Sequence, residues 1–92
     1  MSIIKASKDF VMREIMGEFM LIPTGPAAVK INGMVSLNEI GHFIFQALQK
    51  EQTEQSLVEK ITAEYRTDAE TALTDLREFL DQQRSIGALV ED

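Results

Sequence analysis

The chain has 92 residues, of which 45% are hydrophobic and 26% are charged, with a formal net charge of −6 and no cysteine. A chain of this length forms one domain, here residues 1–92, with a modest core and little room for an enclosed substrate cavity. The lack of cysteine excludes disulfides, thiolate metal sites and cysteine nucleophiles. No run of about 18 apolar residues predicts a transmembrane helix, and residues 1–10 lack the long apolar segment and cleavage site of a signal peptide. The absence of cysteine fits an expected cytoplasmic location.

The charge is unevenly distributed along the chain. Residues 1–36 carry a net charge of +1, whereas residues 37–92 carry −7. Proteins gain most of their affinity for nucleic acids by neutralising phosphates with lysine and arginine. An acidic second half therefore argues against a nucleic-acid partner.

The first third of the chain has a hydrophobic period of two residues, which is typical of β-strands. Segments 10–16 and 18–23 are rich in β-forming residues and flank a glycine, which predicts a hairpin. Segments 27–31 and 34–37 flank Asn32-Gly33, a dipeptide that favours a tight two-residue turn. The sequence thus predicts a small antiparallel sheet of about three strands.

From residue 37 onward the hydrophobic period is that of a helix, and it predicts helices over about 38–49, 54–65 and 68–85. Gly87 is placed to end the last helix in a left-handed conformation, and residues 88–90 are expected to return to the core. The predicted N-caps are Ser36 with Glu39 or alternatively Asn38 for the first helix, Thr53 for the second, and Thr67 with Glu70 for the third. Strands followed by three helices with short connections predict an α+β fold of the winged helix-turn-helix-like type.

No residue pattern predicts catalysis. His42 is the only histidine and has no second histidine or cysteine to help it bind a metal or transfer a proton, so we expect it to be structural or solvated. Asp75, Glu78 and Asp81 recur on one solvated helix face, where Asp81 is also spaced for an ion pair with Arg77. Nucleotide-binding, calcium-loop and nucleophile-elbow motifs are absent. We therefore expect no metal, no cofactor and no enzyme activity.

The predicted sheet is unusual because both of its faces are apolar. Phe19 and Leu21 fall on one face, and Met20 and Ile22 on the other. The helices of so small a domain cover only one face, so the other face or an open edge is left for a partner. The alternatives are that a long loop, the chain termini or self-association through the sheet, giving a homodimer, covers this surface. Gly41 lies inside a predicted helix, which indicates close packing against another element.

Nearly the whole chain, about residues 10–90, resembles the PqqD family, also called RiPP recognition elements. The resemblance lies in four segments that occur in the family's order: FVMREIMGEFMLIPTG, NGMVSLNEIGHFIFQAL, TEQSLVEKITAEY and TDAETALTDLREFLDQQRSIGALV. It implies a winged-helix-turn-helix fold that has lost DNA binding. It also implies that the domain binds the leader of a ribosomally made precursor peptide and delivers it to a modifying enzyme, often a radical SAM maturase.

In this family the leader adds as a strand to the edge of the third strand and enters a groove against the third helix. Strand addition takes affinity from main-chain hydrogen bonds and specificity from alternate side chains. Carried over to this chain, the strand residues are Met34, Val35, Ser36 and Leu37, with Val29 and Ile31 of segment 27–31 as the second choice. The helix residues are Leu76, Phe79, Leu80, Gln83 and Arg84, the last being available for a leader carboxylate. For Leu76, Phe79 and Leu80, packing in the core is the alternative role. A winged-helix DNA-binding regulator is the competing function.

Overall fold

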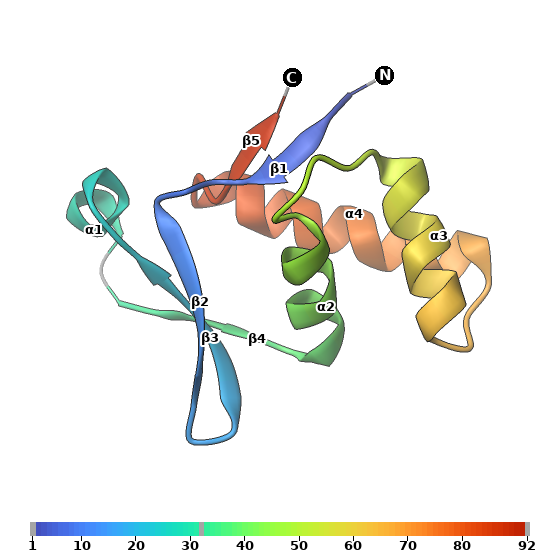
Figure 1. Cartoon of the computed structure of the whole chain (residues 1–92), viewed down its shortest axis with the longest axis horizontal. Helices are drawn as coiled ribbons and strands as arrows, with labels where there is room; N and C mark the ends of the chain where they lie inside the picture. The colour runs from blue at the N-terminus through green and yellow to red at the C-terminus, as the bar shows by residue number, and fades with distance from the viewer. Residues whose placement is uncertain (1, 32, 92) are drawn as a thin grey trace.

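The computed structural model describes residues 2–31 and 33–91 and contains the predicted hairpin. Strand β2 (Phe10–Ile15) pairs antiparallel with β3 (Glu18–Pro23), and the pairing of Ile15 with Glu18 leaves Met16 and Gly17 as the turn. Strand β4 (Val35–Leu37) pairs with the other side of β3, which gives the sheet order β2-β3-β4. The three-stranded sheet is therefore confirmed, with β4 at one edge (Figure 1).

The strand predicted over 27–31 is wrong, because this segment forms the short helix α1 (Pro26–Lys30). Pro26 occupies the first turn, where a missing N–H costs nothing, and two alanines follow it. The backbone bond from the Ile31 N–H to the Ala27 carbonyl, 2.9 Å long, closes the turn. Of the predicted Asn32-Gly33 turn, Asn32 lies outside the described residues, and Gly33 has a φ of 109°.

The three predicted helices are confirmed as α2 (Glu39–Ala47), α3 (Glu54–Glu64) and α4 (Ala69–Ser85). Asn38 caps α2 by accepting a bond from the Gly41 N–H, and Thr53 caps α3 in a reciprocal capping box with Ser56. The predicted Thr67–Glu70 box is wrong. Asp68 caps α4 instead, because its carboxylate accepts the Thr71 N–H at 2.7 Å.

A second sheet, which the sequence pattern did not predict, joins the two ends of the chain. Strand β1 (Ile4–Ala6) pairs antiparallel with β5 (Leu89–Glu91), and Gly87 turns the chain out of α4 with a φ of 77°. The Ala6 N–H also donates to the Leu48 carbonyl, and Ile4 exchanges backbone bonds with Gln52. This sheet therefore holds the α2–α3 connection against the end of α4 (Figure 1).

One core lies between the two sheets and the helices. Its fully buried large side chains come from β1, β3 and the faces of α2, α3 and α4 that the helical period predicts: Ile4, Leu21, Ile44, Phe45, Leu48, Leu57, Ile61, Leu76 and Leu80. The outward residues Met20 and Ile22 of β3 are half-buried. Of the helices in the described part of the chain, none is long and apolar enough to cross a membrane.

Candidate functional site

Strand β4 is an open edge of the three-stranded sheet. β3 pairs with one side of β4, and no strand within the described residues pairs with its other side. Along β4, Val35 and Leu37 turn inward and Ser36 is exposed. An edge strand with free N–H and C=O groups is a template for one more strand. Of the two segments considered, 35–37 therefore forms a free edge, whereas 26–30 is helical.

A cleft runs between β4 and the C-terminal half of α4, and we call it the β4–α4 cleft. Its volume is about 290 Å³. A second cavity of about 260 Å³ shares Asn38, Phe79 and Gln82 with it and continues along α4 to Asp75 and Glu78. The β4–α4 cleft is lined by Val35, Ser36, Leu37, Asn38, Phe79, Gln82, Gln83, Ser85 and Ile86.

Helical spacing explains how α4 serves both the core and this cleft. The core face of α4 buries Ala72, Leu76 and Leu80. The neighbouring face of the helix carries Phe79, Gln82 and Ile86, which are three and four residues apart and line the cleft beside β4. Phe79 and Ile86 are partly buried and pack against the core, so they form apolar walls rather than a mobile surface.

The junction between β4 and α2 fixes the position of Phe79. Asn38 ends β4 and caps α2, and its side-chain oxygen lies 2.7 Å from the Gly41 nitrogen. A Cβ added to Gly41 would lie 3.0 Å from Cε1 of Phe79 and 3.1 Å from Oδ1 of Asn38. The close packing expected at Gly41 is therefore confirmed, and it brings the Phe79 ring against the start of α2.

Five of the predicted site residues line this cleft. Those on β4 lie opposite those on α4, as the resemblance implied. These five are Val35, Ser36, Leu37, Phe79 and Gln83.

Two predicted helix residues lie in the core instead. Leu76 and Leu80 each have 0% of their surface exposed, so a ligand in the cleft does not reach them. The segment before β4 also falls outside the cleft lining. Val29 is 88% exposed on α1, Ile31 follows that helix, and Met34 is 53% exposed just before β4.

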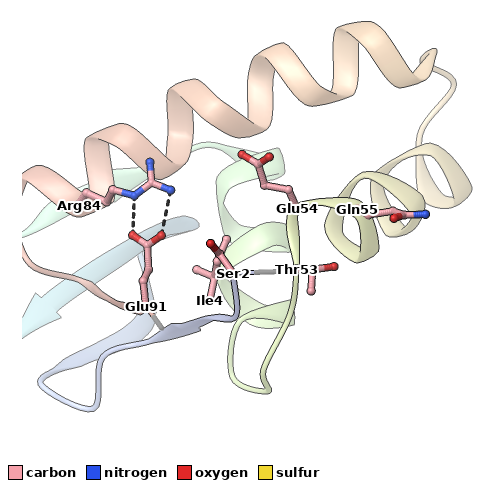
Figure 2. Close-up of a pocket in the computed structure, with 7 residues that line it drawn as sticks. All are labelled: Ser2, Ile4, Thr53, Glu54, Gln55, Arg84 and Glu91. Atoms are coloured by element: carbon pink, nitrogen blue, oxygen red, sulfur yellow. Dashed lines mark hydrogen bonds and ion pairs between the residues drawn. The ribbon is translucent and has the colours of Figure 1, made fainter.

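Arg84 is engaged on another side of α4. Its guanidinium donates two bonds to the Glu91 carboxylate and one, 2.7 Å long, to Asp81. The Glu91 bond raises the pKa of Arg84 above its ordinary value. Figure 2 shows this pair at a separate cavity of about 310 Å³, near Ser2 and Glu54. Arg84 therefore links β5 to α4 and is not among the residues that line the β4–α4 cleft.

Sequence reasoning missed four residues of the cleft: Asn38, Gln82, Ser85 and Ile86. Asn38 was assigned only to helix capping. Gln82 follows Phe79 by three residues and Ile86 follows Gln82 by four, so helical spacing from Phe79 would have found both.

His42 has a structural contact rather than a chemical partner. Its ring stacks on Phe19 of β3, with centroids 3.7 Å apart and an interplanar angle of 14°. The stack joins α2 to the hairpin. Across residues 2–31 and 33–91, no three His, Cys, Asp or Glu side chains gather closely enough to hold a metal ion.

These features define a class of protein: a small α+β domain that carries an unpaired strand edge beside a partly apolar helix face. The family model for Coenzyme PQQ synthesis protein D (PqqD) matches residues 19–89. The chain therefore belongs to the PqqD family, as the resemblance implied.

Among solved structures, the chain is similar to one described as TbiB1 in complex with the TbiA(beta) leader peptide. The TM-score is 0.75 and the identity is 27%, over 92% of this chain and 93% of that chain. None of the curated proteins matches this chain.

Proposed function

We propose that this chain is a non-catalytic module that binds the leader of a ribosomally made precursor peptide. The leader adds as a strand to the open edge of β4, and its inward side chains enter the β4–α4 cleft. The observation that carries the proposal is the unpaired edge of β4 directly beside that cleft. Membership of the PqqD family and similarity to a protein solved with a leader peptide support it.

In this proposal the contact residues are those that line the cleft. The backbone of 35–37 pairs with the leader, which gives affinity without sequence preference. The side chains that give specificity are Val35, Leu37, Phe79, Gln82, Gln83 and Ile86. The module then presents the bound peptide to a modifying enzyme, such as a radical SAM maturase.

We further infer that the arrangement is of the winged-helix type. The β2–β3 hairpin takes the place of the wing, and α3 with α4 takes the place of the helix-turn-helix. The exposed face of α4 carries the acidic residues Asp75, Glu78 and Asp81, whereas a recognition helix presents Arg, Lys, Asn or Gln to base edges. The acidic face favours the peptide function over the DNA-binding one.

The experiment is a calorimetric titration with synthetic N-terminal segments of the short open reading frames that flank the gene. We expect one segment to bind with micromolar or tighter affinity, about −8 kcal/mol, after the cost of ordering the peptide. If no segment binds in the micromolar range to the folded domain, the proposal is wrong.

Proline scanning of β4 tests the mode of binding. Neighbouring residues of an edge strand direct their N–H groups to opposite sides of the strand. Proline has no N–H, so one of the variants Val35→Pro and Ser36→Pro removes a hydrogen bond to β3. The other variant removes an N–H that is free to bind a leader. We expect one of the two to keep the circular dichroism spectrum and lose the leader. Val35→Thr changes the side chain but keeps the backbone N–H, so it should weaken binding less than the proline variant that removes a free donor. Full leader affinity in every proline variant that remains folded would contradict strand addition.

A further inference from the structure

Gln83 is a buried polar residue that the fold itself does not use. It is 2% exposed on α4, and it is the one buried polar residue among the residues that the structure describes. Its side-chain oxygen Oε1 is buried and has no hydrogen-bond partner within residues 2–31 and 33–91. An acceptor left in this state destabilises the protein, because burial removes its water without replacing the bond.

The surroundings of Gln83 make the unpaired oxygen more unusual. The residue lines the β4–α4 cleft together with the apolar side chains of Leu37, Phe79 and Ile86. Leu80, one turn earlier on the same face of α4, is fully buried. A leucine or methionine at position 83 would continue the apolar face and satisfy the core better than glutamine does. In the domain without a bound peptide, the Gln83 amide oxygen therefore makes no stabilising hydrogen bond with the described residues.

A strand added to β4 would supply the missing partner. Alternate side chains of a strand point to the same face of the sheet, so part of the added strand would face α4 as Val35 and Leu37 do. One such side chain would meet Gln83 between the walls formed by Phe79 and Ile86. An uncharged donor fits best, because a cation without a paired anion is costly in apolar surroundings.

We propose that Gln83 is a specificity-determining residue, whose Oε1 accepts a hydrogen bond from an uncharged donor side chain of the bound peptide, such as Ser, Thr, Asn or Gln. The inference rests on the proposed strand addition at β4 and adds to it the chemistry of one peptide position. A peptide with an apolar residue at that position would leave the oxygen unpaired and bind more weakly.

The test uses a phage-displayed library of random peptides as the probe, selected on the whole domain. Selected peptides are tested for binding to the Val35→Pro or Ser36→Pro variant that keeps its fold. Those that no longer bind this variant are the peptides that depend on β4 and the cleft. Among them, we expect one position to be enriched in uncharged donors. The same selection on Gln83→Met should replace this preference by apolar residues. Gln46→Met, an exposed substitution on α2, is the matched control and should retain the wild-type preference.

A double-mutant cycle then measures the bond itself. For one selected peptide, replacing the donor by an apolar residue of similar shape should weaken binding at least tenfold on the wild type and by less than threefold on Gln83→Met. The thermal midpoint of free Gln83→Met should equal or exceed that of the wild type, whereas a structural role for Gln83 would lower it.

The outcomes separate the two proposals. If every selected peptide binds each folded proline variant as tightly as it binds the wild type, strand addition at β4 is overturned. Peptides that need the β4 edge but show no donor preference, or show the same preference on Gln83→Met, would overturn the role of Gln83 alone.

Discussion

At the residue scale, the turn of the β2–β3 hairpin contains an avoidable strain. Met16 and Gly17 have φ angles of 52° and 83°, so both residues of this two-residue turn lie in the left-handed region. Glycine adopts this region freely, but methionine does not, and the Met16 side chain is 98% exposed.

Met16→Asn should therefore stabilise the domain by about 1 kcal/mol, because asparagine before glycine is the preferred pair for this turn. Urea unfolding followed by circular dichroism measures the change. Met34→Asn is the control, since Met34 is also exposed but has no positive φ, and it should change little. An equal or lower midpoint for Met16→Asn would show that the turn is not strained.

The cap of α4 should make stability depend on acid pH. The Asp68 carboxylate accepts the Thr71 backbone N–H, and this bond lowers the pKa of the carboxyl. Since the folded pKa is below the unfolded value of about 3.9, the cap stabilises the fold above that value, and the contribution disappears as pH falls through the folded pKa.

Asp68→Asn keeps a capping oxygen but removes the titration. Urea midpoints measured from neutral to strongly acid pH should therefore fall less steeply for Asp68→Asn than for the wild type. Parallel curves for the two proteins would mean that the bond to Thr71 has no linkage to folding.

Single-residue roles were predictable where one local pattern had no competitor. Thr53 was such a case, and it caps α3 as expected. Thr67 and Asp68 are adjacent and both able to cap, so the sequence alone did not separate them. Arg77 was assigned to Asp81 but instead pairs with Glu54 of α3, 3.2 Å away. Helical spacing shows only neighbours within a helix, and this partner comes from another one.

At the element scale, periodicity found the long elements and failed on the short ones. The period of 3.6 residues located α2, α3 and α4 to within two residues. Segment 27–31 is too short for a period to separate strand from helix, and Pro26 with its two alanines decided in favour of a helix. Strands β1 and β5 have three residues each and gain their order from pairing with each other across the whole chain. No local pattern contains that information.

The contact between α2 and α4 gives a prediction at the same scale. Gly41→Ala adds a methyl group 3.0 Å from the Phe79 ring, which borders the cleft on its other side. Alanine gains about 1 kcal/mol of helix propensity, which offsets part of the clash. We expect the free energy of unfolding to change by less than about 1 kcal/mol, while the displaced ring weakens leader binding several-fold.

Paired urea unfolding and calorimetry on Gly41→Ala measure the two effects. Gln46→Ala raises helix propensity at an exposed position of the same helix and should leave the leader affinity unchanged. If Gly41→Ala binds the leader as tightly as the wild type does, Phe79 does not shape the site.

At the scale of the whole molecule, the net negative charge of this domain differs from the basic surface that a DNA-binding protein requires. Residues 37–92, which include α2, α3 and α4, carry a net charge of −7. We expect no binding to duplex DNA tighter than about 10⁻⁴ M in a fluorescence anisotropy titration at low salt, where non-specific binding is strongest. Sequence-specific nanomolar binding would contradict the assignment to peptide recognition.

The position proposed for the peptide site could be predicted from the sequence, but the side chains that line the cleft could not. The resemblance placed it between 34–37 and the last helix, and the cleft lies there. The resemblance did not indicate which face of α4 lines the cleft. Leu76 and Leu80 belong to the core face, and Arg84 turns to Glu91. These assignments depend on how α4 is rotated against the sheet, which is set by tertiary packing.

Backbone amide hydrogen exchange, followed by NMR with and without the bound leader, tests whether the leader pairs with β4. Strand addition at β4 predicts strong slowing at those amides of 35–37 that point away from β3, because they become hydrogen-bonded. It also predicts little change in β2, the opposite edge of the sheet. Protection that appears along β2 or α3, with the amides of 35–37 exchanging as before, would contradict the account.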